Sequence, residues 1–481
     1  MKRHPGIRRL KINLPGGIVS IGKLYTLLTI FKEAALDELS LGNRQQLVIL
    51  ATDKQYKLLD LLLAKADVQM EWDADDYPNI ISSYVADEVF ANTSWLSEGV
   101  YKDILDTFHY QPQLKINIVD RLQNLVPFFT GNFNFISSDI SNYWYLCIRF
   151  PKTNQLFHWP TLIYSDDIAE LSRVMEWVIM SEHHFFYNQS SIDGNRLVDR
   201  VSRKMTITTQ PYLHPLEHTD FQLPFYEGIN AYAREKLWLG IYRRNEIFTI
   251  DFLTELCQVC LDTRIGQLYT TPWKSILVKN IAQSDRKNWS ILLNKYRINV
   301  RHAANELNWQ LEDRCKETLQ LKRTLVKAFD DDDLRTSKLC FAIKTRKQTG
   351  LFGSIVIQQD TFQHKPLYTV MYTENFNPNN KQYITFGQTL HTEELARLLI
   401  QLCNHYYSEH SAYTTNQTIK PKAPLPHQKS LAIYQCARCQ TQYDPRYGDP
   451  WQNIPEGTAF TTLTNYHCSV CEAPQETFVL L

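Results

Sequence analysis

Apolar residues recur at intervals of three and four positions in two segments of the chain that lie 229 residues apart. This spacing places the apolar residues on one face, so each segment is expected to form an amphipathic helix. The positions are Leu24, Leu28, Phe31 and Ala35 in the first segment and Leu253, Cys257 and Cys260 in the second.

The two segments begin a longer internal repeat. Each helix is followed by a predicted short strand, a polar turn and an apolar strand; turn and strand read GNRQQLVIL at 42–50 and TPWKSILVK at 271–279. A second amphipathic helix follows in each copy, starting at Asp53 and near Ser284. Helices and strands that alternate in duplicated units predict an α+β fold with pseudo-twofold halves.

A change of composition marks a boundary near the C-terminus. The segment 411–429, SAYTTNQTIKPKAPLPHQK, has three prolines, three lysines and almost no large apolar residue, which predicts a linker. It separates a body of about 410 residues from a tail of about 50. So short a tail is not expected to fold on hydrophobic burial alone, without a metal or a partner.

Overall composition narrows the classes of function. The chain is 44% hydrophobic with 51 basic and 51 acidic side chains, so it is expected to be globular and to lack a field that attracts nucleic acid or membranes. The N-terminus has no apolar run of signal-peptide length, and no segment has about 18 successive apolar residues. We therefore expect a cytoplasmic protein, in which cysteines bind metal or pack in cores.

Four of the ten cysteines form two Cys-x-x-Cys pairs in the tail, Cys436 with Cys439 and Cys468 with Cys471. Four thiolates at this spacing can close a tetrahedral site for zinc or for iron. Spacing alone favours a structural zinc ribbon, because that class is the more common. A third pair, Cys257 and Cys260, lies on a predicted apolar helix face, where core packing is the expected role.

The residues between the tail pairs favour iron instead, because CxxC, YDPxxGDP, IPEGTAF and CxxCxAP, in that order, resemble a rubredoxin. The resemblance implies that the four cysteines hold one iron ion that transfers single electrons. It also implies an apolar shell and a characteristic loop. The shell is Tyr434, Tyr443, Phe460, Leu463 and Phe478, and the loop contains Asp444, Pro445, Gly448, Asp449 and Pro450.

The tail departs from the rubredoxin pattern at a few positions. The glycine that usually follows each pair is Gln440 in one case and Glu472 in the other. If these positions keep a positive φ, each costs about 1–2 kcal/mol. The family's tryptophan before the second pair is Tyr466, and the proline inside that pair is Ser469.

The body resembles the paired ferredoxin-like half-domains of siroheme nitrite and sulfite reductases. The motifs are INLPGGIVSIGKLYTLL and NRQQL in the first half, LWLGI and IGQLYTTPWKSILVKNI in the second, and LYTVMYTENF with TEELARLLIQLCNHYY at the end. The resemblance divides the chain into two half-domains, two reductase-like α/β domains, a linker and the rubredoxin-like domain. The expected ranges are 1–75, 76–225, 226–300, 301–410, 411–430 and 431–481, in which the half-domains are the first and third.

Those reductases need four cysteines for an iron–sulfur cluster next to siroheme. Only Cys315 and Cys340 remain here, with Trp309 and Lys344 at the partner positions. Two thiolates cannot hold a cluster that needs four. Of the cations that grip siroheme and substrate, Arg44 matches one and Lys115 is the remaining candidate. We therefore predict a body without siroheme or 4Fe-4S cluster, a pseudoenzyme with no catalytic residues.

These observations predict an electron carrier whose cofactor-free body docks a protein redox partner, such as an assimilatory nitrate or nitrite reductase or its electron donor. Sulfite reduction is the related setting. One alternative is a non-enzymatic scaffold or regulator with a structural zinc site. A second is a siroheme enzyme with unusual ligands.

Overall fold

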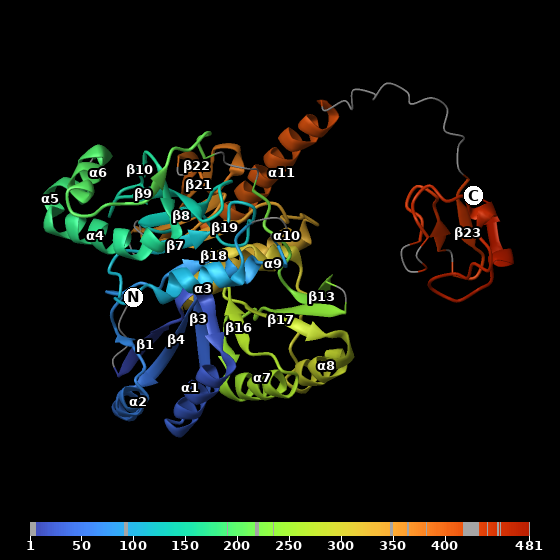
Figure 1. Cartoon of the computed structure of the whole chain (residues 1–481), viewed down its shortest axis with the longest axis horizontal. Coiled ribbons are helices and arrows are strands. Elements are labelled where there is room, and N and C mark those ends of the chain that lie inside the picture. The colour runs from blue at the N-terminus through green and yellow to red at the C-terminus, as the bar shows by residue number, and fades with distance from the viewer. Residues whose placement is uncertain are drawn as a thin grey trace. The chain divides into compact units, whose positions relative to one another are not determined.

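The chain forms two compact units, Met1–Tyr406 and Tyr407–Leu481. The computed structural model (Figure 1) describes residues 6–90, 95–189, 191–216, 221–233, 235–346, 350–362, 365–380, 382–416, 432–439, 441–449, 452 and 454–480. Helix α11 (Thr392–Asn416) continues past residue 411. The predicted linker is therefore wrong at its start, and its remainder lies outside the described residues.

The first half-domain is an antiparallel sheet in the order β15-β3-β4-β1-β5, with helices α1 and α2. The strand bounds are β15 Phe248–Thr249, β3 Glu38–Gly42, β4 Gln46–Thr52, β1 Ile7–Asn13 and β5 Glu71–Trp72. Helix α1 spans Ile21–Glu33 and α2 spans Asp53–Lys65. Helix α2 begins at a capping box, in which Thr52 and Gln55 satisfy each other's backbone N–H groups.

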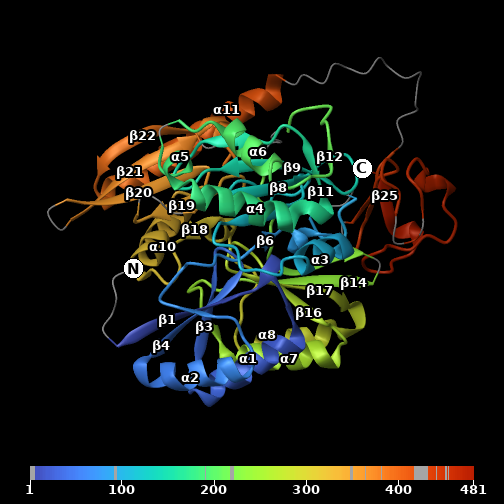
Figure 2. The same ribbon diagram turned by 60° about the vertical axis from the view of Figure 1, so that its left-hand side comes forward.

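The second half-domain repeats this plan in the order β13-β14-β17-β16-β2, with helices α7 and α8. The bounds are β13 Gly228–Ala233, β14 Lys236–Ile241, β17 Ile276–Ala282, β16 Gln267–Thr270, β2 Ile18–Ser20, α7 Ile250–Asp262 and α8 Arg286–Lys295. The predicted helix–strand–strand–helix order is confirmed in both copies. Figure 2 shows the four helices side by side beneath the strands.

The 229-residue offset extends to details of the backbone. Helices α1 and α7 start 229 residues apart, and Ser20 and Thr249 cap them by accepting hydrogen bonds from backbone N–H groups three residues on. The turn residues Gln45 and Lys274 have the same left-handed φ, 55° and 56°. Because α1 and α7 share one apolar core, the two copies are packed as a single body.

The two halves exchange short strands. Strand β2 lies in the first half of the sequence but pairs with β16, so that Leu268 lies opposite Val19. Strand β15 lies in the second half and pairs with β3, with Phe248 opposite Leu39. Each sheet is therefore completed by a strand from the other copy. The contiguous residue ranges predicted for the half-domains do not include this exchange.

The two reductase-like domains each contain a mixed sheet with the same sequence of strand directions. The first has the order β12-β11-β9-β8-β7-β6, with β10 beside β9, and the second has the order β18-β19-β20-β21-β22. Three successive strands are parallel in each sheet, and the next is antiparallel.

The remaining bounds follow the chain. The strands are β6 Ile81–Ser82, β7 Ile116–Val119, β8 Phe133–Ser137, β9 Tyr143–Arg149, β10 Leu156–His158, β11 Leu162–Tyr164, β12 Thr209–Gln210, β18 Trp309–Leu311, β19 Phe341–Lys344, β20 Ile355–Phe362, β21 Lys365–Thr373 and β22 Tyr383–Leu390. The helices are α3 Glu98–Asp106, α4 Ile168–Ser181, α5 His183–Phe186, α6 Gly194–Ser202, α9 Ala304–Leu307 and α10 Lys316–Asp331.

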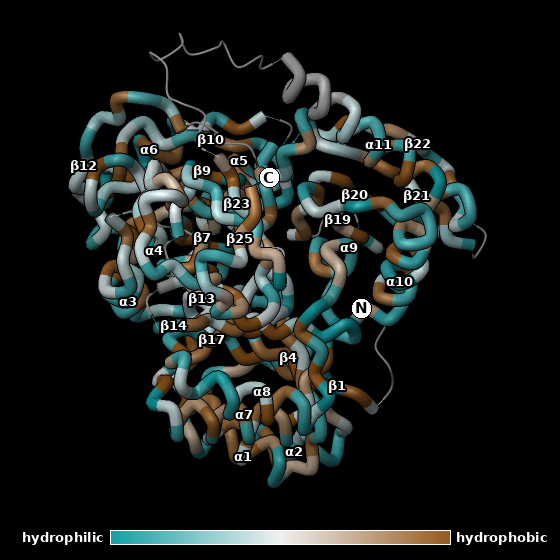
Figure 3. Tube along the Cα trace, turned by 90° about the vertical axis from the view of Figure 1, so that its right-hand side faces the viewer, coloured by the Kyte–Doolittle hydropathy of each residue, from teal (hydrophilic) through white to brown (hydrophobic). Residues whose placement is uncertain are grey.

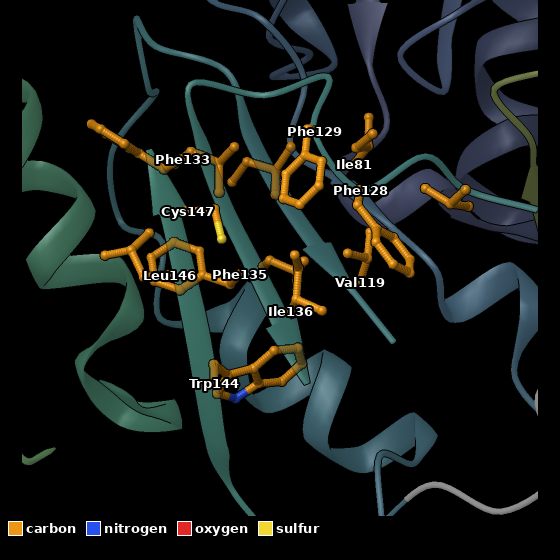
Figure 4. Close-up of a cluster of buried hydrophobic side chains, with 14 of the residues drawn as sticks. Ile81, Val119, Phe128, Phe129, Phe133, Phe135, Ile136, Trp144, Leu146 and Cys147 are labelled. Carbon is orange, nitrogen blue, oxygen red and sulfur yellow. The ribbon is translucent and has the colours of Figure 1, made fainter. Parts of the chain in front are cut away.

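Apolar side chains fill the space between these layers. Figure 4 shows part of the core of the first reductase-like domain, with Phe133, Phe135 and Trp144 packed around the strands. Brown apolar stretches also follow β4 and β17 in Figure 3, where the half-domain sheets meet their helices. Cys257 and Cys260 are both buried, which confirms their predicted core role, and Cys147 and Cys403 are buried as well.

A buried amide joins the two halves where their hairpins meet. The Gln45 side chain donates to the carbonyl oxygens of Ser82 (3.2 Å) and Thr270 (2.8 Å) and accepts from the Ser82 N–H (3.0 Å). The Asn79 amide donates to three further carbonyls, those of Leu14, Arg44 and Gln45. Buried amides that find such partners fix one arrangement of the backbone segments around them.

Two leucines of α2 provide a matched test of this packing. Leu59 is 0% exposed and Leu61 is 53% exposed. Leu59→Ala should lower the free energy of unfolding of the body by about 2–5 kcal/mol, because it leaves a cavity. Leu61→Ala should change it by less than about 0.5 kcal/mol. Urea unfolding followed by tryptophan fluorescence measures both, and equal losses would contradict the burial of this helix face.

Candidate metal centre

The two Cys-x-x-Cys pairs lie on equivalent turns of the tail. Cys436 ends strand β23 (Tyr434–Cys436), which lies between β24 (Gln442–Tyr443) and β25 (Phe478–Leu480). Its N–H donates to the carbonyl five residues on, that of Thr441, at 2.9 Å, and the N–H of Cys468 bonds Ala473 in the same way at 2.8 Å. Each turn therefore directs both of its cysteine side chains inward.

The four sulfur atoms converge on one point. All lie within 4.8 Å of one another, and the two pairs approach across the site, with Cys436 Sγ 3.7 Å from Cys471 Sγ and Cys439 Sγ 3.4 Å from Cys468 Sγ. A tetrahedral metal with ligand bonds of about 2.3 Å requires sulfur–sulfur edges of about 3.8 Å. The donor set fits such an ion and leaves no coordination position open.

Local hydrogen bonds favour the thiolate form at one ligand. The Thr441 hydroxyl lies 3.1 Å from Cys439 Sγ, and this contact, together with the backbone at Thr441, lowers the pKa of the Cys439 thiol to about 6. A thiol must lose its proton before it binds metal, so this contact prepares the site at neutral pH. The sequence analysis did not identify Thr441 as a residue of the site. Its position, two residues after the second cysteine of a pair, would have indicated a hydroxyl close to that thiol.

An aromatic shell surrounds the sulfur atoms, as the sequence predicts. Tyr466, at the position of the family's tryptophan, donates its hydroxyl to Asp449 Oδ2 at 2.8 Å inside this core. The Tyr466 hydroxyl therefore has a hydrogen-bond partner at the position where the family has a tryptophan. The buried members of the shell are Tyr443, Phe460, Tyr466, Ala473 and Phe478, with Tyr434, Ile454 and Leu463 partly buried against them.

The predicted loop and turn positions have the expected backbone. Gly448 has φ 63°, and a Cβ there would lie 2.3 Å from the carbonyl oxygen of Ile454, so a side chain does not fit. Asp449 and Ile454 form an antiparallel bridge. Glu472 has φ 57°, which confirms the strained position after the second pair. Gln440 and Pro450 lie outside the described residues.

Comparison with known proteins gives the same result as the geometry. The model of the rubredoxin family matches residues 433–478. Over 51 residues the chain is 37% identical to the rubredoxin of Azotobacter vinelandii and covers 71% of that protein. Through its tail, the chain belongs to the rubredoxin family.

Two further relatives match this rubredoxin domain, each over 10% of the chain. A probable rubredoxin HupI of Rhizobium leguminosarum bv. viciae is 44% identical over 48 residues, and the chain covers 69% of that protein. A probable rubredoxin HupJ of Rhodobacter capsulatus is 43% identical over 51 residues, and the chain spans only 18% of that protein. The rubredoxin domain is therefore a small part of this chain.

The fold of the body is also found in a solved structure. The NirA protein of Mycobacterium tuberculosis superposes with a TM-score of 0.61 at 13% sequence identity, covering 81% of this chain and 79% of that one. The body therefore has the nitrite/sulfite reductase-like α+β fold that its motifs predict. The protein is a fusion of that fold with a rubredoxin domain.

The residues at the expected cluster site do not fit a four-iron cluster. Cys340 is buried beside the Ser354 hydroxyl (3.4 Å), and Cys315 lies beside the Glu317 carboxylate (3.4 Å). The Trp309 ring stacks on Phe341 at 4.6 Å and donates its N–H to the carbonyl of Asn305. Among the described residues, the tail cysteines are the one group of three or more potential metal ligands that converge.

Arg44, the predicted anion ligand, is held by the protein itself. Its guanidinium donates to the carbonyls of Asn79 and Ile116 and to the Asn117 side chain. Lys115 directly precedes strand β7 in the sequence and lies near the Arg44 guanidinium, whose charge acts on it. The sequence missed two further cations nearby, Arg149 and Lys344, which end strands β9 and β19.

None of the helices within the described residues combines the length and the apolar character that crossing a membrane requires.

The strained turn at Glu472 gives a direct test of the site's backbone. Glu472→Gly should stabilise the metal-bound rubredoxin domain by about 1 kcal/mol, because glycine adopts positive φ without the side-chain penalty. Glu476→Gly is the control, since Glu476 lies in a 3-10 turn (Gln475–Thr477) and has no positive φ to relieve. Thermal loss of the visible absorption measures both variants; equal or lower stability of Glu472→Gly would contradict the strain.

Proposed function

We propose that this protein carries single electrons. In this proposal the rubredoxin domain holds one iron ion between Cys436, Cys439, Cys468 and Cys471, and the body docks the domain to a protein redox partner. The observation that carries the proposal is the closed set of four converging thiols in a rubredoxin-family domain. When bound, the iron supplies a ferrous–ferric couple and has no free position for a substrate.

The surface around the site supports electron transfer to another protein. Cys436 and Cys468 are buried, whereas Cys439 and Cys471 are partly exposed. Val470, between the two cysteines of the second pair, is 69% exposed. One side of the sulfur cluster therefore lies close to the domain surface, so a partner that contacts this side approaches the site closely.

The size and state of the body support a role in recognition. It has a reductase-like fold although the residues at the expected cluster site do not fit a four-iron cluster. Rubredoxin domains of about 50 residues make up most of the length of relatives such as that of Azotobacter vinelandii. An electron carrier thus needs no such body, and we infer that the body selects the partner.

The reductase-like fold points to the class of partner. We propose a protein of nitrate or nitrite assimilation, or of sulfite reduction: either the reductase itself or its electron donor. This step rests on the fold alone and on no substrate-binding residue of this chain.

Metal content and visible absorption test the metal part of this proposal. The purified protein should contain about one iron per chain, show the colour of ferric iron in four-thiolate coordination without siroheme bands, and lose it on reduction. Cys468→Ser should abolish the colour, and Cys315→Ser, which changes a cysteine of the body, should keep it. Stoichiometric zinc in a colourless protein would favour the scaffold alternative, and siroheme bands would favour the reductase alternative.

The role of the body is tested by removing it. A protein of residues 431–481 should still bind iron and accept electrons, because it has its own core. It should deliver electrons to the physiological reductase at least about tenfold more slowly than the full chain, since docking replaces a diffusive encounter by a positioned one. Stopped-flow rates at equal iron concentration measure the difference. Equal rates would mean that the body does not dock the partner.

A further inference from the structure

The second half-domain borders a cavity of about 540 Å³. Its walls come from three parts of the chain: the segment 225–230, which enters strand β13, helix α8, and the segment 298–302, which leads to α9 (Figure 1). None of the tail cysteines and none of the cations near Arg44 lines this cavity. It is therefore a separate feature of the body.

Glu227 and His302 form a hydrogen-bonded pair in the wall of the cavity. The side chain of Glu227 is 0% exposed and that of His302 is 7% exposed. Oε1 of Glu227 accepts from Nδ1 of His302 at 2.6 Å, and Oε2 accepts from the backbone N–H of His302 at 2.7 Å. One residue thus engages both carboxylate oxygens, which fixes the orientation of the imidazole ring.

The other ring nitrogen of His302, Nε2, has no such partner. Nδ1 faces a carboxylate oxygen and therefore carries the hydrogen, which leaves Nε2 of the neutral ring as an acceptor. No group within the described residues donates to Nε2, and this atom is not sealed from solvent. Because the ring lines the cavity, Nε2 offers its lone pair there.

Other contacts already hold the two segments of the pair together, so the ring is not needed for that purpose alone. The Asn230 side chain donates to the carbonyl of Glu227 at 3.0 Å. Gly228 has φ 92°, and a Cβ there would lie 3.4 Å from the carbonyl oxygen of Val300, so the two backbones run close together. A carboxylate that orients a nearly buried imidazole, with one nitrogen left open, is typical of a ring that meets a ligand.

The charged side chains that line the cavity give it a positive character. Arg286 and Arg301 are both exposed, and within the described part of the chain neither forms an ion pair. Glu227 is the one carboxylate that lines the cavity, and its oxygens already accept from His302. The two guanidinium groups therefore remain available to an anion.

The rest of the lining is largely apolar. The Phe225 ring is 50% exposed, which leaves an aromatic surface open at the cavity. Leu293 and Ile298 line it as well and belong to the core of the half-domains. Apolar walls with a few placed polar groups are the usual composition of small-molecule sites, and the volume lies within their usual range.

We propose that this cavity binds a small organic anion that has a flat apolar body and one hydroxyl or N–H donor. The donor bonds to Nε2 of His302, the body packs against Phe225, and the anionic group contacts Arg286 and Arg301. A guanidinium group binds a carboxylate or a phosphate through paired N–H donors, so both kinds of anion share the required chemistry. The proposal is independent of the metal in the rubredoxin domain.

Calorimetric titration of the full-length protein at pH 7 with two pairs of probes tests the proposal. 4-Hydroxyphenylacetate represents a carboxylate ligand, and phenylacetate is its counterpart without the hydroxyl donor. Uridine 5′-monophosphate represents a phosphate ligand, and N3-methyluridine 5′-monophosphate lacks its N–H donor. At least one of the two donor-bearing anions should bind saturably, one per chain, and its counterpart should bind at least about tenfold more weakly, because Nε2 then stays unpaired.

A variant of the histidine separates a ligand contact from a structural role. His302→Asn keeps an N–H group that can donate to Glu227 and removes Nε2. It should bind both members of the pair equally, since the preference for the donor resides at Nε2. A merely structural role would weaken both members and keep their ratio.

The arginines provide a second test with exposed side chains, whose replacement leaves the core unchanged. Arg286→Gln combined with Arg301→Gln should weaken both members of the pair at least about tenfold. Lys287→Gln is the control, because Lys287 is exposed on the same helix but does not line the cavity. It should leave the affinities unchanged.

Four results would overturn the proposal. They are the absence of saturable binding for both donor-bearing anions, equal wild-type affinity for the two members of a pair, a preference that persists in folded His302→Asn, and unchanged binding in the double arginine variant. Circular dichroism melting shows which variants are folded, and the wild-type and arginine results decide if His302→Asn is not.

Discussion

Four sulfur atoms within 4.8 Å of one another are stable as thiolates only around a cation, and the tail depends on this constraint. Its remaining core is a small aromatic shell, too little to order some 50 residues by burial alone. Metal affinity is therefore largely folding free energy for this domain. The same closed coordination would leave an ion bound there no free position for a substrate.

The body is held together in a different way, and this explains how its fold persists without the cluster residues. The duplicated helices and sheets pack through a common apolar core, and the side chains of Gln45 and Asn79 join backbone segments from separate parts of the chain. The Trp309 ring packs on Phe341 near the expected cluster position. These contacts are all between residues of the chain itself, so they do not depend on a prosthetic group.

The sequence predicted those parts of the structure that repeat or that follow a fixed spacing. The two helix–strand–strand–helix units could be predicted because their apolar positions recur at the same offset. The four tail cysteines could be predicted as metal ligands because they form two Cys-x-x-Cys pairs. The exchanged strands β2 and β15 were not legible, since three and two residues show no periodicity. The start of the linker was wrong because α11 continues through residues of low helix propensity at 411–416.

The cations near Arg44 show a different limit of sequence reasoning. Arg149 and Lys344 each end an otherwise apolar strand, a position that is unremarkable for a single residue. In the structure the charge of Arg149 contributes to lowering the pKa of both Lys115 and Lys344. Only the three-dimensional arrangement of two separate domains brings these side chains near one another.

The exchange of β2 and β15 also sets the order in which the body can form during synthesis. The first sheet has its strands β1, β3 and β4 once residue 52 has left the ribosome, but its edge strand β15 follows at Phe248–Thr249. At 5–20 residues per second, that interval lasts roughly 10–40 s. During this time β3 has an open edge, and β2 waits for β16. The nascent chain must therefore keep a partly paired sheet in solution until its second copy is translated.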